Sequence, residues 1–217
     1  MINTKKTVYF VRHGQSEHNV APVFQAEDSP LSYHGNQQAD LVAERASHLN
    51  FDALIASPLP RAKATAQAIS NKTKKNIIFS DLFVERIKPK SINGKPYTDE
   101  IANKIWRQWE ESMTTPGMRV EDGENYDDII VRAKKALDYL LERPEKSILV
   151  VTHGYFLRTI VARVLLAESL NPAAFKNFHR AASIENTGIT VLQYRDDFEQ
   201  DHSWRLWTYN DHAHLAN

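Results

Sequence analysis

The stretch that decides the fold is Thr7-Val8-Tyr9-Phe10-Val11-Arg12-His13-Gly14, close to the start of the chain. Its first five residues form a largely apolar, β-branched and aromatic run, which is typical of a strand buried on both faces. Arg12 and His13 follow directly, so two polar side chains stand at the carboxyl end of this strand. In an open α/β sheet, ligands bind beyond that end of the strands. The stretch therefore predicts the first strand, at residues 7–11, and one wall of a binding site.

Beyond this strand, short apolar runs alternate with segments of helical periodicity, which is the pattern of a mostly parallel sheet flanked by helices. A long loop reaches Pro30, and Ser32 is the expected N-cap of a helix that ends near residue 49. Residues 147–152 form the most apolar strand, which should therefore be central. The remaining elements are expected as strands at residues 53–56 and 76–80 and as helices at residues 59–73, 126–143 and 155–166.

The alternation breaks between the third and fourth predicted strands, where several prolines interrupt the pattern. This segment predicts an inserted lobe at about residues 86–125, with one helix at about residues 98–113. The tail alternates at residues 189–192 and 204–207, which predicts antiparallel strands at one edge of the sheet. We therefore expect residues 1–217 to form a single α/β domain. Its architecture should be a three-layer α/β/α sandwich with a mostly parallel central sheet, an inserted helical lobe and an antiparallel C-terminal edge.

The composition narrows the classes of function. Among 217 residues, 27 Lys and Arg balance 27 Asp and Glu, so no broad basic surface for nucleic acid or a membrane is expected. Cysteine is absent, which excludes a disulfide framework, a zinc–thiolate cluster and a cysteine nucleophile. No apolar run approaches the ~20 residues that cross a bilayer, and the first residues lack the apolar core of a signal peptide. We expect a soluble, cytoplasmic protein; no pattern specifies its oligomeric state.

Polar side chains follow four of the predicted strands: Arg12 and His13, then Arg61, then Glu85, and finally His153 with Gly154. Two guanidinium groups match the charge and bidentate geometry of a phosphomonoester dianion. A neutral imidazole is a competent nucleophile toward phosphorus, and a carboxyl group can protonate the leaving alkoxide. Gly14 and Gly154 leave room for backbone amides to approach phosphate oxygens. This combination predicts a phosphoryl-transfer site.

Each of these residues also has a structural explanation when it is taken alone. An arginine is commonly a surface salt-bridge partner, a histidine at a strand end is commonly a hydrogen-bonded structural residue, and a glutamate after a strand is commonly solvated. The joint placement favours a site, because independent structural residues have no reason to gather at one end of four strands. His212 and His214 lack a third ligand nearby, so no metal site is expected there.

Five motifs, in order along the chain, resemble those of the histidine phosphatase superfamily, the phosphoglycerate mutase-like group. They are VRHGQSEHN at residues 11–19, LSYHGNQQA at 31–39, SPLPRAKATA at 57–66, LFVE at 82–85 and VTHG at 151–154. The resemblance covers essentially the whole chain. It implies an α/β fold and phosphoryl transfer through a histidine.

The resemblance also implies a role for each matching residue. His13 would be the nucleophile that becomes phosphohistidine, and Glu85 would donate and later accept the proton. Arg12, Asn19, Arg61 and His153 would hold the phosphoryl oxygens, together with the backbone at Gly154. The role of Asn19 comes from the resemblance alone, since an amide in a loop is ordinarily a turn residue. Because the arginines and His153 would neutralise the phosphate, neither a metal ion nor another cofactor is expected.

Two departures separate this chain from the mutase branch of the family. Residues 24–27, FQAE, stand where the mutases carry a Thr/Cys-Gly pair, and residues 86–90, RIKPK, replace a Gly-Gly-Leu stretch. We therefore expect a phosphatase that hydrolyses a small phosphorylated metabolite and releases inorganic phosphate. The alternatives are a cofactor-dependent phosphoglycerate mutase and a non-catalytic phosphate-binding module.

Two further groups of residues have open interpretations. Four basic residues either meet a substrate anion or belong to a solvated loop: Lys88, Lys90, Lys95 and Arg119. Four aromatic residues either line the pocket for the organic group or pack the inserted lobe onto the sheet: Tyr97, Trp106, Trp109 and Tyr126.

Overall fold

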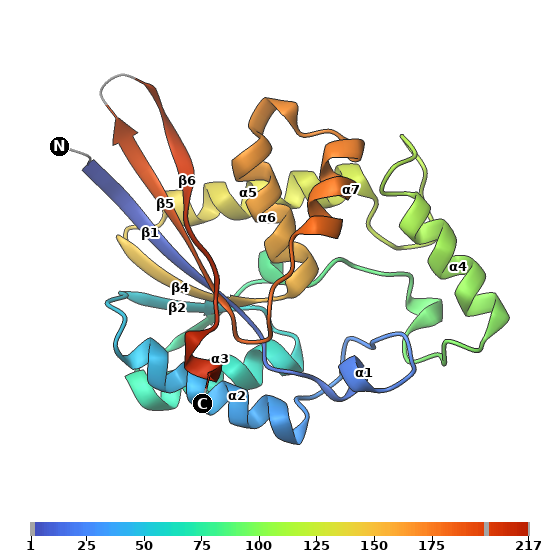
Figure 1. The fold of residues 1–217 in the computed structure, drawn as a ribbon, viewed down its shortest axis with the longest axis horizontal. Helices are drawn as coiled ribbons and strands as arrows, with labels where there is room; N and C mark the ends of the chain where they lie inside the picture. Colours follow the sequence, from blue (N-terminus) through green and yellow to red (C-terminus); the bar gives the residue numbers. More distant parts are fainter. Residues whose placement is uncertain (1–2, 198–199, 217) are drawn as a thin grey trace.

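The computed structural model describes residues 3–197 and 200–216, and its centre is one sheet of six strands (Figure 1). The strands lie in the order β3-β2-β4-β1-β5-β6. Their bounds are β1 Asn3–Arg12, β2 Ala53–Ala56, β3 Ile77–Phe79, β4 Ser147–Thr152, β5 Ile189–Asp197 and β6 Gln200–Asp211.

The sheet is mixed in the way the sequence predicts. Strands β3, β2, β4 and β1 are parallel, whereas β5 pairs antiparallel with β1 and β6 pairs antiparallel with β5. β4 lies between β2 and β1, and every residue of it after Ser147 is buried. The α/β fold class, the central position of β4 and the antiparallel C-terminal edge are therefore confirmed.

The described residues form seven α-helices, which cover both faces of the sheet (Figure 1). Helices α2 and α3 pack on one face, α5 and α6 pack on the other, and α7 packs against α6. None of the helices in the described ranges has the length and apolarity that crossing a membrane requires. The bounds are α1 Glu17–Val20, α2 Tyr33–Ser47, α3 Pro60–Thr73, α4 Glu100–Glu111, α5 Tyr126–Glu142, α6 Gly154–Leu166 and α7 Pro172–Ala181.

Two hydrophobic cores form because successive side chains of a strand point to opposite faces. Val8 and Phe10 of β1 join the core beneath α5 and α6, where they lie in one cluster with Ile160. Val11 of β1 joins the second core, beneath α2 and α3, in one cluster with Ile69. Burial on both faces explains why the buried strands read as almost continuous apolar runs.

Side-chain caps begin helices α2, α4, α5 and α7, the last through Asn171. Ser32 Oγ accepts a hydrogen bond from the Gly35 amide at 3.0 Å, which confirms the predicted N-cap of α2. Asp99 caps α4 by accepting from the Ala102 amide, and Asn125 caps α5 by accepting from the Asp128 amide. Such caps satisfy backbone N–H groups that have no partner within the helix.

Residues 86–125 contribute α4, which is shorter at both ends than the predicted helix. This segment and α1 lie beyond the carboxyl ends of the parallel strands (Figure 1). The segment is tied to the loop after β1. Val23 pairs with Pro96, and Phe24 shares a small core with Ile92 and Ala102. The loop and the lobe therefore form one wall at the end of the sheet where the predicted site residues lie.

Three further features depart from the sequence prediction. β1 begins earlier, at Asn3, and the buried Lys6 on it donates Nζ hydrogen bonds to the carbonyls of Leu140 and Leu141 at the end of α5. The short helix α1 lies within the predicted loop. Helix α7 was not predicted, although Asn171 caps it and Pro172 occupies its first turn, which is a recognisable start signal.

Candidate active site

The strand ends bring the predicted polar residues together. Arg12 ends β1, His13 follows it, and His153 follows β4, the strand that lies beside β1. The imidazole rings of His13 and His153 have centroids 4.9 Å apart, and Arg61 Nε lies 3.3 Å from His13 Nε2. Glu85 comes from the segment after β3. The predicted gathering of these residues at one edge is thus present in the fold.

The surroundings of His13 set its tautomer and its charge. Nδ1 lies 2.7 Å from the carbonyl oxygen of Gly14, which can only accept, so Nδ1 carries the proton. Nε2 then holds a lone pair, which accepts from Arg61 Nε. Complete burial lowers the pKa of His13 well below its ordinary value, and the charges of Arg61 and Arg12 lower that pKa further. His13 is therefore a neutral imidazole with a basic nitrogen facing the arginine.

His153 is held as the second imidazole of the site. Its Nε2 lies 2.8 Å from Ser57 Oγ, and its buried Nδ1 has no hydrogen-bond partner among the described residues. Burial, followed by the charge of Arg61, lowers the pKa of His153 well below its ordinary value. A neutral ring whose second nitrogen is unpaired can donate to or accept from a ligand in the site.

Two arginines lie next to these rings, Arg61 buried and Arg12 partly buried. Arg12 donates through Nη1 to the Ile184 carbonyl, while its buried Nε has no partner among the described residues. Arg61 donates through Nη1 to the Glu27 carbonyl at 3.2 Å. Burial lowers the pKa of Arg12, and it lowers the pKa of Arg61 to about 10. Both side chains remain cations near neutral pH, and both supply charge at low solvent exposure, where it binds an anion strongly.

Glu85 occupies the N-terminus of α6. Its Oε1 accepts from the Phe156 amide at 2.9 Å and from the Arg86 amide at 3.0 Å, and Oε2 accepts from the Tyr155 amide at 3.2 Å. The free N–H groups and the positive end of the helix dipole hold this carboxyl group. Because α6 begins directly after His153, the same contacts hold Glu85 at the strand end that His153 follows. The charge of Glu85 acts on Arg12 and Arg61, where it raises the pKa against the effect of burial.

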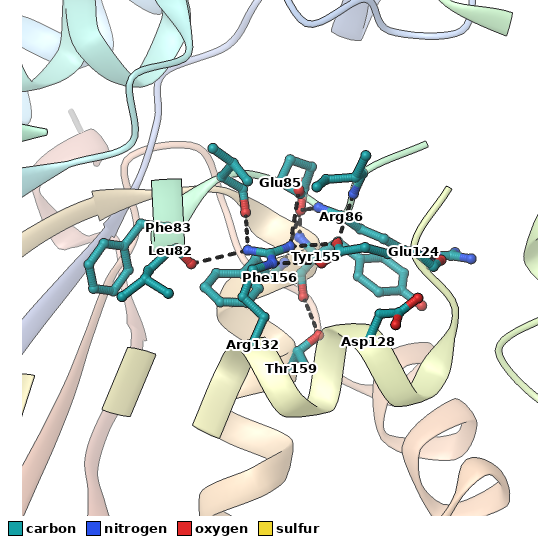
Figure 2. Close-up of polar contacts among 12 residues, drawn as sticks. Leu82, Phe83, Glu85, Arg86, Glu124, Asp128, Arg132, Tyr155, Phe156 and Thr159 are labelled. Carbon is teal, nitrogen blue, oxygen red and sulfur yellow. Dashed lines mark hydrogen bonds and ion pairs between the residues drawn. The ribbon is translucent and has the colours of Figure 1, made fainter. Parts of the chain in front are cut away.

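Arg132 holds the segment that carries Glu85 (Figure 2). It donates to the carbonyl oxygens of Leu82, Val84 and Glu85, and it pairs through two nitrogens with Glu124, at 2.7 Å each. Glu124 also accepts from the Ile87 amide at 2.9 Å. Sequence reasoning missed this pair, because no local pattern separates Arg132 from other charged residues of its helix.

The glycines of the motifs let backbone and side chains approach closely. The Gly14 amide donates to Thr65 Oγ1 at 3.1 Å, so this amide is bound within the protein. A Cβ on Gly14 would lie 2.4 Å from the Gly35 carbonyl oxygen, which explains both glycines by close packing of backbone. At Gly154 a Cβ would lie 3.1 Å from Arg12 Nε, so glycine there leaves room for the guanidinium.

The remaining predicted residues divide into those near the site and those away from it. Asn19 is exposed on α1, and its Oδ1 accepts from the Ser16 amide at 3.1 Å. Lys88 donates to the Gln25 carbonyl, and burial, followed by the charge of Arg61, lowers its pKa to about 8. Lys90 lines the same cavity as Arg61 and Glu85, where it pairs with Asp122. Arg119 pairs with Asp128, and Lys95 is exposed.

Two cavities open on either side of Glu85, Arg86 and Lys88. One, of about 800 Å³, also reaches Arg61 and Glu27. The other, of about 480 Å³, is lined by aromatic residues of the loop after β1, of the lobe and of α6. A ligand whose phosphoryl group lies against the histidines and arginines therefore has room for an organic group.

The histidine and carboxylate side chains of the described residues do not cluster as metal ligands. Within residues 3–197 and 200–216, no three histidine, aspartate or glutamate side chains form a group that could hold a metal ion. His212 and His214 contact separate protein groups, the Asn210 carbonyl and Thr187 Oγ1.

Comparison with known proteins extends these observations. The sequence profile described as the histidine phosphatase superfamily (branch 1) matches residues 8–211. A probable phosphoglycerate mutase, GpmB, of Enterobacter sp. (strain 638) is 32% identical over 212 residues, which is 96% of this chain and 94% of that protein. A structure of phosphoserine phosphatase from Entamoeba histolytica with phosphoserine is 25% identical, with a TM-score of 0.74 over 97% of this chain and 99% of that one.

A mycobacterial glucosyl-3-phosphoglycerate phosphatase shares the fold, with a TM-score of 0.74 at 22% identity over 94% of this chain and 98% of that one. The profile match spans almost the whole chain and contains the histidine, arginine and glutamate positions described above. On this ground the chain is a member of the histidine phosphatase superfamily.

Proposed function

We propose that this protein is a phosphomonoester hydrolase that works through a phosphohistidine at His13. The observation that carries the proposal is the state of His13, a buried neutral imidazole with Nδ1–H bound to the Gly14 carbonyl and with its Nε2 lone pair facing Arg61. This is the protonation state that a nitrogen nucleophile requires. Membership of a family that includes named phosphatases supports it.

The reaction proceeds in two displacements. His13 Nε2 attacks phosphorus, the bond from phosphorus to the ester oxygen breaks, and Glu85 gives its proton to the leaving alkoxide. Water then attacks the phosphohistidine, Glu85 takes the proton back, and Nε2 leaves with its electron pair. Inorganic phosphate is the product, and His13 and Glu85 return to their starting states.

The phosphoryl oxygens are held by the side chains around His13. Arg12 and Arg61 supply the positive charge, with Arg61 turning from Nε2 toward the phosphate. His153 donates through Nδ1 while Ser57 Oγ–H donates to its Nε2, and Asn19 donates through its side-chain amide. The backbone at Gly154 completes the site. No metal ion or other cofactor is required, since the guanidinium groups neutralise the dianion.

The whole chain acts as one catalytic domain, with residues 86–125 as the lobe over the site. The partners are a small phosphorylated metabolite and the phosphate that is released; neither nucleic acid nor a membrane takes part, and the site of action is the cytoplasm. The β-bridge between Val23 and Pro96 joins the loop after β1 to the lobe. This contact supports the role of the lobe as a cover over the end of the sheet where the substrate binds.

Hydrolysis of p-nitrophenyl phosphate tests the proposal. Wild type should release nitrophenolate, His13→Ala should not, and His34→Ala, which removes an exposed histidine on α2, should match wild type. Equal rates in wild type and His13→Ala would eliminate His13 as the nucleophile. Absence of turnover in wild type, together with tight phosphate binding, would favour the binding module instead.

Phosphoglycerate mutase activity is the second candidate, because curated relatives carry that name. We favour hydrolysis, since residues 24–27 and 86–90 lack the glycines and small residues of the mutase pattern. Simple phosphomonoesters should therefore release phosphate, whereas incubation with 3-phosphoglycerate and bisphosphoglycerate should give little 2-phosphoglycerate. Mutase turnover ~100-fold above phosphate release, a gap of about 2.7 kcal/mol between competing barriers, would reverse this choice.

A further inference from the structure

The smaller cavity beside Glu85 is walled by aromatic rings from three segments of the chain. Its rings are Phe24, Tyr97, Trp106, Trp109 and Tyr155. Phe24 is buried and packs edge-on against Tyr97, with ring centroids 4.9 Å apart, and lies 6.0 Å from Trp106. Tyr97 and Trp106 are 50% and 37% exposed, so two large rings keep open faces in a concave site. Such surface is covered favourably by an apolar or ring-shaped group.

Arg86 is the more buried of the two cations among the described residues that line this cavity, and it is already neutralised and hydrogen-bonded by the protein. Arg86 is 1% exposed at its side chain and pairs through Nη1 with Glu110 at 2.6 Å. It donates through Nη2 to the Trp109 carbonyl at 2.6 Å and through Nε to the Glu124 carbonyl at 3.3 Å. Its guanidinium also stacks on the Trp109 ring, 3.5 Å from the centroid. Arg86 and Tyr155 are labelled in Figure 2, and the guanidinium lies 5.2 Å from the Tyr155 ring centroid. Arg86 is thus committed to protein partners.

The second cation, Lys88, belongs to the phosphoryl end of the cavity. It lines both cavities with Glu85, and the charge of Arg61 acts on it. The polar amides farther out are occupied as well, because Asn103 donates to the Tyr97 carbonyl and Gln25 donates to Ser16 Oγ. Lys88 is thus the one cation among the described lining residues of this cavity that has no acidic partner, and it lies at the phosphoryl end. A second carboxylate or phosphate at the outer end would meet rings and Glu110.

The geometry points to a substrate whose organic group is uncharged and contains a ring, with Trp106 and Tyr97 as the residues that determine specificity. This inference rests on the proposed phosphatase activity at His13 and adds the substrate class. It separates the protein from enzymes that act on three-carbon phosphorylated acids, whose carboxylate needs a cation of its own. The cavity of about 480 Å³ is also larger than a three-carbon acid fills.

Binding of non-hydrolysable phosphonates tests the inference independently of turnover. The two ligands compared are 3-phenylpropylphosphonate and propylphosphonate, which differ by one phenyl ring. A third ligand, 3-phosphonopropionate, represents a three-carbon acid. Calorimetry with wild type should give ~10- to 100-fold tighter binding of the phenyl compound than of propylphosphonate, the value expected from covering one aromatic ring. 3-Phosphonopropionate should bind no better than propylphosphonate.

Variants assign this preference to the rings. Trp106→Ala should reduce the phenyl preference by ~10-fold, while binding of propylphosphonate stays near the wild-type value. Trp207→Ala is the matched control, because this tryptophan is 62% exposed on β6, the outermost strand of the sheet, and does not line the cavity. Equal binding of the two alkyl phosphonates by wild type, or tighter binding of 3-phosphonopropionate, would overturn the inference. Hydrolysis of p-nitrophenyl phosphate by the same preparation reports separately whether the proposed function holds.

Discussion

Replacing Arg132 by methionine should destabilise the protein far more than replacing any exposed cation of the same helix. Arg132 and Glu124 expose only 12% and 10% of their side chains and form a two-point ion pair. Arg132 also donates to three carbonyl oxygens of the segment from Leu82 to Glu85, and its guanidinium stacks 3.9 Å from the Phe156 ring centroid. One side chain therefore links α5, α6 and the Glu85 segment.

The magnitude follows from what the substitution leaves behind. Removing one partner of a buried ion pair costs about 3–5 kcal/mol, because the other charge stays buried without compensation. Each hydrogen bond from a charged donor contributes about 1.5–3 kcal/mol, but these contributions overlap with the ion pair and do not add. Methionine retains most of the packing on Phe156. We expect Arg132→Met to lower the free energy of unfolding by about 3–5 kcal/mol.

Urea unfolding at pH 7 measures this loss, and Lys134→Met on the same helix is the control. Lys134 pairs with Asp138, both half exposed, so its loss should change stability by at most about 0.5 kcal/mol. Arg132→Met combined with Glu124→Gln should recover part of the loss, since the unpaired carboxylate is then gone. The reasoning is wrong if Arg132→Met unfolds at the same urea concentration as Lys134→Met.

The remaining predictions concern the chemistry and its pH dependence. Glu85→Gln should slow the hydrolysis of ethyl phosphate by ~100-fold or more and that of nitrophenyl phosphate much less, because only the alkoxide leaving group needs the general acid. Equal losses of rate on both substrates, with phosphohistidine formation shown to limit the rate, would exclude Glu85 as the general acid. A chelator should leave the rate unchanged, whereas loss of activity restored by Mg²⁺ or Zn²⁺ would contradict the metal-independent mechanism. Burial lowers the folded-state pKa of His13, His153 and His179 below the ordinary 6.5, so the unfolded chain binds more protons below that pH. The free energy of unfolding should then fall as the pH falls below about 6.5, by up to about 1.4 kcal/mol per pH unit for each histidine. His179→Asn should make this dependence on pH less steep. A wild-type urea midpoint that does not change from pH 7 to pH 5 would refute this prediction.

The strands and the gathering of site residues could be predicted because they depend on local patterns. An apolar run followed at once by Arg12 and His13 specifies both a buried strand and the end at which a ligand meets it. The same rule placed His153 beside His13, since β4 and β1 are neighbours and parallel. Ser32 was recognisable as an N-cap from its position before a helical pattern.

The contacts that hold the site depend on residues far apart in sequence, so no local pattern could show them. Arg132 donates to carbonyls about fifty positions away, and Lys6 donates to the Leu140 carbonyl at the end of α5, 134 positions further along the chain. Gly14 illustrates the limit at a single residue. A glycine after a strand indicates close approach of another group, but the sequence does not show that this group is the Gly35 backbone. Helix α7 is different, because Asn171 as N-cap and Pro172 in the first turn are a local pattern from which the start of a helix is predictable.

Rapid-quench labelling of the enzyme tests the central claim most directly. Wild type is mixed with excess p-nitrophenyl phosphate carrying a radiolabelled phosphoryl group and quenched in alkali within the first turnovers. A phosphohistidine is stable in alkali and lost in acid, and mass spectrometry of the labelled peptide places it. The account predicts label on His13 in wild type and in His34→Ala, and none in His13→Ala. Turnover by wild type without such label, or label that persists in His13→Ala, would contradict it.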